Sequence, residues 1–292
     1  MEKPALILTR FAPSPTGLLH IGHAYAAVFA EKIASHFGGH CLLRLENIDE
    51  GRCRQKFETA IYDDLAWLGF HWATPVRRQS EHMDDYQAAL NQLSQMDLLY
   101  PCFCTRKDIK DATAAPHFGS HGPDGPLYPG TCRTLTPCQR QQKIESGRPY
   151  ALRLNMKRAI QQAGPLFWKD LAQGTIQATP DIFGDVVLAR KDTPTSYHLA
   201  VTVDDDLQAI RIVTRGSDLF QATHIHRLLQ KLLGLRTPEY LHHKLMCDQN
   251  GQRLAKRNKA TSLQSLRKSG HTPTDILIKF NQLVQVQLEE IV

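Results

Sequence analysis

Two histidines stand three residues apart near the N-terminus, directly after a proline-rich stretch. The run from Arg10 to His23 reads RFAPSPTGLLHIGH and ends in the tetrad His20-Ile21-Gly22-His23. At this spacing on a helix the two imidazoles lie one turn apart, so both can donate hydrogen bonds to phosphate oxygens. Gly22 lets a flat base approach the backbone closely. The run predicts a nucleotide-phosphate site; two ordinary surface histidines in a proline-rich turn are the alternative.

Three cysteines form a second group that could do chemistry. Cys102 and Cys104 are separated by one residue, and Cys132 follows in another loop. Three thiolates that converge from two short loops suit a tetrahedral Zn²⁺ site with a structural role. A metal-free set of buried cysteines is the alternative. Three further residues could supply the fourth ligand: His117, His121 and Cys138.

The first histidine run is positioned by alternating strand and helix patterns. We expect strands at 5–10 and 41–45 and helices at 20–37 and 55–68, with glycines closing the first helix. This βαβα order predicts a parallel sheet with helices on its faces. The histidine run then lies at the carboxyl end of a strand, where open α/β sheets bind ligands.

The middle of the chain has a different composition. Residues 101–150 hold four cysteines, and prolines and glycines are frequent, which indicates an inserted, loop-rich subdomain. Strands return at 185–190 and 211–214, and Ser217 can cap a helix that runs to Leu233 and closes at Gly234. The pattern is helical again after Pro273. We therefore predict four parts: a first half of the α/β domain at 1–99, the insert at 100–184, a second half of the α/β domain at 185–235 and a basic helical segment at 236–292.

Composition and charge narrow the class of protein. The 292 residues are 42% hydrophobic and 22% charged, and the net charge is +6. Nine Lys/Arg and three Asp/Glu lie between Arg236 and Lys279, which suggests an anionic partner such as nucleic acid; a solvated surface helix is the alternative. No apolar run reaches about 18 residues and no secretory signal is present, so we expect a cytoplasmic protein. Seven cysteines without a secretory signal do not favour a disulfide framework; Cys41, Cys53 and Cys247 are expected to pack.

The tetrad is identical to the HIGH signature of the class I aminoacyl-tRNA synthetases. The preceding FAPSPTG resembles the glutamyl branch of that family, as do SYHLAV at 196–201 and VTRGSDL at 213–219. The resemblance extends from about residue 6 to about 280. It implies a Rossmann-like α/β catalytic domain with an inserted zinc-containing subdomain and a helical C-terminal segment. It also implies an enzyme that activates L-glutamate with ATP.

Glutamate requires a particular set of groups in its pocket. Its two carboxylates call for two cationic forks, for which Arg10 and Arg215 are suited, and its ammonium calls for a carboxylate, for which Glu46 stands at a strand end. Ser14 and Tyr197 can add hydrogen bonds. The loop residues Phe11, Ala12 and Pro13 complete the predicted glutamate site. The sequence leaves open which arginine takes which carboxylate.

The second family signature, a KMSKS-like loop, is weakly represented. The best candidate is the run RLAKR at 253–257, which keeps only the second lysine, Lys256. A mobile cation there can stabilise charge that builds on departing pyrophosphate, with Arg253 and Arg257 as helpers. We expect Mg²⁺ to arrive held mainly by ATP. The three acidic residues Asp204, Asp205 and Asp206 are expected to be a solvated turn rather than a metal site.

The cysteine spacing resembles that of the glutamyl-Q branch of this family. That branch uses C-x-C followed by Y-x-x-x-C, which implies Tyr128 as the fourth zinc ligand, with Cys138 as the runner-up. Residues 259–292 are too few for an anticodon-binding domain. The branch implies transfer of glutamate to the queuosine base at the wobble position of tRNA(Asp), with the anticodon stem-loop held by a monomer. A minimal glutamyl-tRNA synthetase and a non-catalytic, zinc-containing RNA-binding paralogue are the alternatives.

Overall fold

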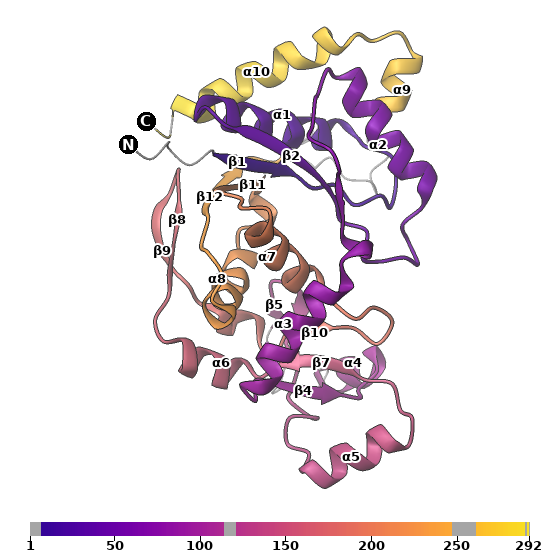
Figure 1. Ribbon diagram of the computed structural model, residues 1–292, viewed down its shortest axis with the longest axis vertical. Helices are drawn as coiled ribbons and strands as arrows, with labels where there is room; N and C mark the ends of the chain where they lie inside the picture. Colours follow the sequence, from indigo (N-terminus) through magenta and orange to yellow (C-terminus); the bar gives the residue numbers. More distant parts are fainter. Residues whose placement is uncertain (1–6, 114–120, 247–260, 290, 292) are drawn as a thin grey trace.

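The computed structural model describes residues 7–113, 121–246, 261–289 and 291. Figure 1 shows the first and last parts of the chain together at one end of the molecule and the middle part at the other. The strands are β1 Leu8–Phe11, β2 His40–Leu45, β3 Arg77–Arg78, β4 Leu99–Cys102, β5 His121–Gly122, β6 Gly125–Pro126, β7 Ala151–Leu154, β8 Phe167–Asp170, β9 Gly174–Gln177, β10 Val187–Ala189, β11 Ile212–Gly216 and β12 Glu239–His243. The α-helices are α1 Ile21–His36, α2 Gln55–Trp67, α3 Met83–Gln95, α4 Arg106–Thr113, α5 Pro137–Glu145, α6 Met156–Ala163, α7 Tyr197–Leu207, α8 Ala222–Leu233, α9 Leu263–Lys268 and α10 Pro273–Glu289. Short 3₁₀ turns are η1 Gln79–Glu81, η2 Pro180–Phe183 and η3 Ser217–Leu219.

Parallel strands form the centre of the catalytic region. β1, β2 and β3 pair in parallel, and so do β11 and β12. The two groups meet where the Arg211 amide donates to the Leu8 carbonyl at 2.8 Å. The predicted βαβα start and the parallel sheet are confirmed. The carboxyl ends of β1 and β11 therefore lie at the same edge, where ligands bind in open sheets.

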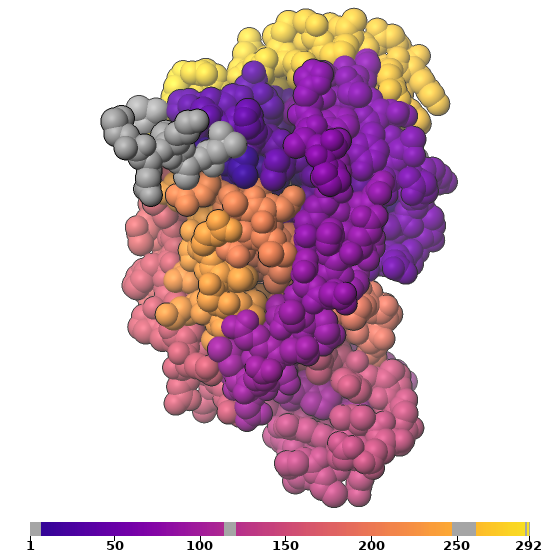
Figure 2. Space-filling view, in the orientation of Figure 1, coloured from indigo at the N-terminus to yellow at the C-terminus, as the bar shows by residue number. Residues whose placement is uncertain are grey.

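The C-terminal helix covers the first helix and not the sheet directly. Figures 1 and 2 show α10 along the end of the molecule next to α1. The rings of Tyr25 and Phe280 lie 5.5 Å apart, and the Tyr25 hydroxyl bonds the Gln287 side chain at 3.1 Å. Burial of apolar residues on both helices fixes α10 in this place. No helix in the described part of the chain combines the length and apolar character that crossing a bilayer requires.

The start of α8 differs from the sequence prediction, whereas its end agrees. Gly234 adopts the left-handed conformation with φ 69° and closes the helix as expected. The expected cap at Ser217 is wrong. Its backbone carbonyl accepts from the Phe220 amide and forms the 3₁₀ turn η3, and α8 begins only at Ala222. The turn keeps the chain near the end of β11 before the helix starts.

The insert has its own sheet but shares strand pairing with the catalytic region. β4, β7 and β10 form an antiparallel sheet. The β8–β9 hairpin instead joins the parallel sheet, where β8 pairs with β12. The boundaries at 99/100 and 184/185 stay predictions, and strand pairing crosses the second of them. In Figure 2 the part of the insert around α5 protrudes at the end opposite α10.

A cluster of buried charges connects α7 to the first strands. Arg44 is fully buried on β2, and its guanidinium donates to Asp205 at 2.8 Å and lies 3.7 Å from Asp204. Asp205 also accepts from Arg10 at 3.0 Å, and Asp204 accepts from Arg77 at 2.7 Å. Each cation is therefore compensated by a carboxylate, as burial of charge requires.

The expectation of a solvated turn at Asp204–Asp206 is wrong. All three residues lie in α7, and Asp204 and Asp205 are buried against guanidinium groups. Only Asp206 faces outward, where it pairs with Arg236 at 2.9 Å. Burial alone would raise the pKa of Asp205, but Arg10 and Arg44 hold that pKa below its ordinary value.

We expect Asp205→Asn to lower the free energy of unfolding by about 3–5 kcal/mol at pH 7, because Arg44 would lose its nearest carboxylate. The lowered folded-state pKa means that Asp205 stabilises the fold above the unfolded value of about 3.9, and that this contribution is lost as the pH falls through the folded value. The cost of the substitution should therefore shrink in acid. Urea unfolding across pH 3–8 measures it.

The matched control is Asp206→Asn, the next residue on the same helix. Its partner Arg236 is exposed, so the expected cost is less than about 1 kcal/mol. Equal costs for the two variants, or a cost at Asp205 that does not change with pH, would contradict the role given to the buried cluster.

Candidate functional site

The start of α1 is capped by its own histidines. His20 is the N-cap, and its Nδ1 accepts from the Gly22 amide at 3.1 Å. His23 Nδ1 in turn accepts from the His20 amide at 3.1 Å. Because each Nδ1 is an acceptor, the proton of each neutral ring is on Nε2, the donor form needed for a phosphate oxygen. The helix dipole adds a partial positive charge at this end of α1.

A cavity of about 410 Å³ opens at the carboxyl ends of β1 and β11. It brings together every predicted nucleotide and glutamate residue that the structure describes: Arg10, Phe11, Ala12, Pro13, Ser14, His20, Gly22, His23, Glu46, Tyr197 and Arg215. The remaining predicted residue, Lys256, lies outside the described residues. Within the described part of the chain, the histidine tetrad and the residues predicted to bind glutamate therefore line one cavity.

Other lining residues were not predicted from the sequence. They are Ala26, Thr214, Gly216, Asp218, Leu219, His243, Leu245 and Met246. His243 ends β12 and Leu245 and Met246 follow it; β12 pairs in parallel with β11. These residues could have been predicted if residues 239–243 had been recognised as a strand, because parallel strands place binding sites at their carboxyl ends.

Arg10 and the loop after β1 are held in place by hydrogen bonds. Arg10 is 5% exposed and donates to Asp205 and, at 2.8 Å, to the Thr214 carbonyl. The Ser14 hydroxyl donates to the Glu46 carbonyl at 2.7 Å, and the Glu46 amide donates to the Pro13 carbonyl at 3.0 Å. The loop is therefore fastened to the end of β2, which fixes Glu46 in the lining of the cavity.

Burial changes the acid–base behaviour of two groups in the cavity. It raises the pKa of Glu46, although Arg44 at 3.3 Å opposes the change. It also raises the pKa of the Tyr197 hydroxyl, so this group stays a neutral donor at physiological pH. A positive group next to Glu46 would favour its charged form.

Arg215 differs from Arg10 in its partners. The guanidinium, 6% exposed, donates to His242 at 3.2 Å, to His226 at 3.0 Å and to the Thr223 hydroxyl at 2.5 Å. Within the described residues no carboxylate lies at ion-pair distance from it. The cavity thus contains one arginine whose charge is met by Asp205 and one whose contacts are all uncharged side chains.

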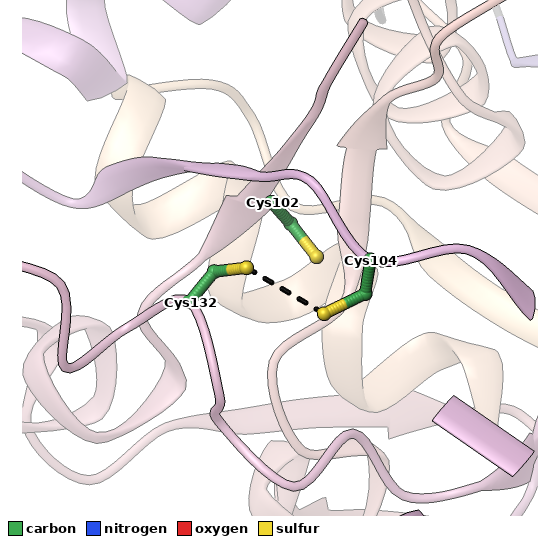
Figure 3. A group of neighbouring side chains, drawn as sticks. All are labelled: Cys102, Cys104 and Cys132. Carbon is green, nitrogen blue, oxygen red and sulfur yellow. Dashed lines mark hydrogen bonds between the residues drawn. The ribbon is translucent and has the colours of Figure 1, made fainter. Parts of the chain in front are cut away.

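The three predicted cysteine ligands converge in the insert. Figure 3 shows the side chains of Cys102, Cys104 and Cys132 turned toward a common point, and their sulfur atoms lie within 4.8 Å of one another. A tetrahedral zinc with bonds of about 2.3 Å places its sulfur ligands about 3.8 Å apart, so the observed cluster fits such an ion. The Cys104–Cys132 sulfur distance is 3.5 Å.

Tyr128 is placed where a fourth ligand is needed. Its hydroxyl lies 3.5 Å from the Cys104 sulfur and accepts from the Cys132 amide at 2.8 Å. The runner-up, Cys138, is exposed on α5 and is not in the cluster. His121 is exposed on β5 and is not in the cluster either, and His117 lies outside the described residues. The geometry favours Tyr128 over the other candidates that the structure describes.

Comparison with known proteins identifies the family of the chain. Residues 6–291 match the family model "tRNA synthetases class I (E and Q), catalytic domain". A "Glutamyl-Q tRNA(Asp) synthetase" of Rhodobacter capsulatus is 47% identical over 92% of this chain and 98% of the relative. A "Glutamate--tRNA ligase" of Aquifex aeolicus is 35% identical over 91% of this chain but 55% of the relative. The crystal structure of the glutamate-tRNA synthetase from Elizabethkingia anophelis superposes with a TM-score of 0.76 and 26% identity, covering 92% of this chain and 59% of that one. The chain belongs to the catalytic-domain family of the class I tRNA synthetases for glutamate and glutamine.

Proposed function

We propose that this chain activates L-glutamate with ATP, without tRNA, and then transfers glutamate to the queuosine base at the wobble position of tRNA(Asp). The observation that carries the first step is the shared cavity. One cavity holds two arginine forks, a carboxylate and the histidine-capped start of α1. These are the groups that a dicarboxylic amino acid and a nucleotide phosphate need side by side.

The amino acid is bound by opposite charges at its ends. Arg10 and Arg215 bind the two carboxylates, and Glu46 binds the ammonium group, whose positive charge favours ionised Glu46. Tyr197 and Ser14 add hydrogen bonds. Phe11, Ala12 and Pro13 line the same cavity and lie between Arg10 and α1 along the chain.

The nucleotide is bound at the start of α1. His20 and His23 direct Nε2–H donors toward the phosphates, and Gly22 allows the base to lie against the backbone. The α-carboxylate oxygen of glutamate attacks the α-phosphorus of ATP, the bond to pyrophosphate breaks, and glutamyl-adenylate forms. A hydroxyl of the acceptor then attacks the carbonyl carbon and AMP leaves. Mg²⁺ enters with ATP, held mainly by its phosphates.

We assign Lys256 to the departing pyrophosphate because of where the described residues before and after its segment lie. Met246 lines the cavity, and on the other side Ser262 bridges to His20 while the Leu263 amide donates to the Leu19 carbonyl at 2.9 Å. Of the described residues that flank the segment with Lys256, Met246 thus lines the cavity and Ser262 lies beside the histidine tetrad. A cation there would stabilise the charge that develops on the leaving group.

Zinc is assigned a structural role in the insert. Cys102, Cys104, Cys132 and Tyr128 would hold it, and no step of the proposed chemistry uses it. Bound zinc would deprotonate the thiols; without the metal, burial raises the pKa of Cys104 to about 11. The metal therefore offsets the cost of placing these thiolates among buried residues.

The acceptor is chosen from length and relatives. The chain covers 98% of the relative named for the glutamyl-Q reaction and 55% of the glutamate–tRNA ligase. Single-stranded loops are where bases can be splayed out and read. We assign the anticodon stem-loop of tRNA(Asp) to the basic segment from Arg253 to Lys268, bound by a monomer. ATP and tRNA as substrates place the reaction in the cytoplasm.

We expect glutamate-dependent ATP–pyrophosphate exchange in the absence of tRNA, with glutamine a poor substitute. Lys256→Ala should lower the exchange rate by about 10²–10³-fold, the scale for removing one donor aimed at developing charge. The control is Lys268→Ala, an exposed lysine on α9. A change of less than about twofold in the Lys256 variant would place the leaving-group cation elsewhere.

We expect one zinc ion per chain in protein purified without chelators, measured by elemental analysis. Cys104→Ser should lose the metal, whereas Cys138→Ser should keep it because Cys138 is exposed and outside the cluster. Tyr128→Phe tests the fourth ligand. Hydrogen exchange should rise in residues 100–113 and 121–135 more than in the parallel sheet when the metal is removed. Full occupancy in Cys104→Ser would rule out this ligand set.

We expect labelled glutamate to become attached to tRNA(Asp) that carries queuosine, and not to tRNA(Asp) without queuosine or to tRNA(Glu). Nuclease digestion of the product should place the label in the anticodon fragment and not in the 3′-terminal fragment. Stable label on tRNA(Glu), or label on tRNA(Asp) regardless of queuosine, would favour a minimal glutamyl-tRNA synthetase. No label on any tRNA, with exchange intact, would refute the transfer step alone.

A further inference from the structure

The partners of Arg215 have one consistent arrangement of protons. A guanidinium only donates, so His226 Nδ1 and His242 Nε2, the atoms that contact it, must be acceptors. Both imidazoles are therefore neutral and carry their proton on the other nitrogen. Those protons also have acceptors. His242 Nδ1 lies 2.7 Å from the fully buried carboxylate of Asp170, and His226 Nε2 lies 3.2 Å from His198 Nδ1.

The chain of donors ends at carboxylates on both sides. His198 accepts from His226, so its proton is on Nε2, which lies 3.0 Å from Asp124 on the turn between β5 and β6. On the other side Asp170 is held by the amides of Ala172 and Gln173. The two negative charges are thus each separated from Arg215 by at least one neutral ring.

The environment keeps these rings neutral. Burial, and then the charge of Arg215, lowers the pKa of His226 well below its ordinary value. Burial lowers the pKa of His242 as well, although the hydrogen bond with Asp170 opposes this. At physiological pH both rings position the guanidinium without cancelling its charge.

Arg10 shows the alternative that the fold uses elsewhere. It is as deeply buried as Arg215, but Asp205 binds it directly at 3.0 Å. A buried cation without a carboxylate partner costs free energy that an incoming anion can return. The arginine that lacks one is therefore the group whose contacts improve most when a ligand brings a negative charge.

We propose that His226 and His242 are specificity-determining residues that keep Arg215 positioned but uncompensated, so that it selects a negatively charged amino-acid side chain over its neutral amide. This inference rests on the proposed glutamate activation. Glutamine has the same shape as glutamate and the same α-carboxylate, so only the side-chain charge separates the two. A site built to pair a charge rejects the analogue that leaves the charge unmet.

The test compares two substitutions that differ only in charge. In His226→Asn the amide oxygen can still accept from Arg215, whereas in His226→Asp a carboxylate would neutralise it. The KM for glutamate and the inhibition constant of glutamine are measured by ATP–pyrophosphate exchange, together with the KM for ATP. Circular dichroism and thermal unfolding report folding.

We expect the Asp variant to lose roughly 10- to 100-fold of its preference for glutamate over glutamine relative to the Asn variant, with an unchanged KM for ATP. If His226 had only a structural role, both substitutions would lower the preference for glutamate over glutamine by the same factor. Equal preference in the two folded variants would therefore overturn the proposal. If the Asp variant does not fold, the pair His226→Glu and His226→Gln is compared in the same way. Absence of glutamate-dependent exchange in the unsubstituted protein would instead refute the proposed function.

Discussion

Burial of guanidinium groups is the constraint on which the rest of the structure depends. Arg10, Arg44 and Arg215 are at most 6% exposed, and each must be met inside the protein. Arg44 and Arg10 share the carboxylate of Asp205, which ties β1 and β2 to α7. This tie places the end of β1, and with it the loop that leads to α1, at a fixed distance from the helix that begins with Tyr197. The cavity exists because these elements cannot move apart without separating buried charges.

The same constraint explains why the acidic run on α7 was misread from the sequence. Three consecutive aspartates carry local signals of a solvated turn, and nothing within a few residues contradicts them. The partners of Asp204 and Asp205, which are Arg10, Arg44 and Arg77, are more than a hundred residues away along the chain. Long-range compensation of charge has no local pattern, so residue types alone could not reveal it. The predicted start of α8 was wrong for a related reason. The Phe220 amide donates to the backbone carbonyl of Ser217 and not to its side chain, so the residue starts a 3₁₀ turn and does not cap the helix.

The parts that were predicted correctly have local patterns. The strand–loop–helix around His20 follows from apolar spacing and from a motif whose chemistry needs a helix start. The cysteine spacing brings Cys102, Cys104 and Cys132 together because two short loops need little chain to converge. The roles of the arginines were predictable only as a pair. The sequence could not separate Arg10 from Arg215, because the difference is in their partners and not in the residues themselves.

The insert carries the cysteine cluster, and it also contacts residues that lie behind the lining of the cavity. Asp124, on its β5–β6 turn, contacts His198 at 3.0 Å, and His198 follows Tyr197 at the start of α7. Through His226 this contact continues to Arg215. Asp185, just before β10 and directly after the insert, ties the insert to the following part of the chain by accepting from Tyr100 at 2.5 Å and from Arg133 at 2.8 Å. Hydrogen bonds therefore connect the β5–β6 turn of the insert, through His198 and His226, to Arg215 in the cavity.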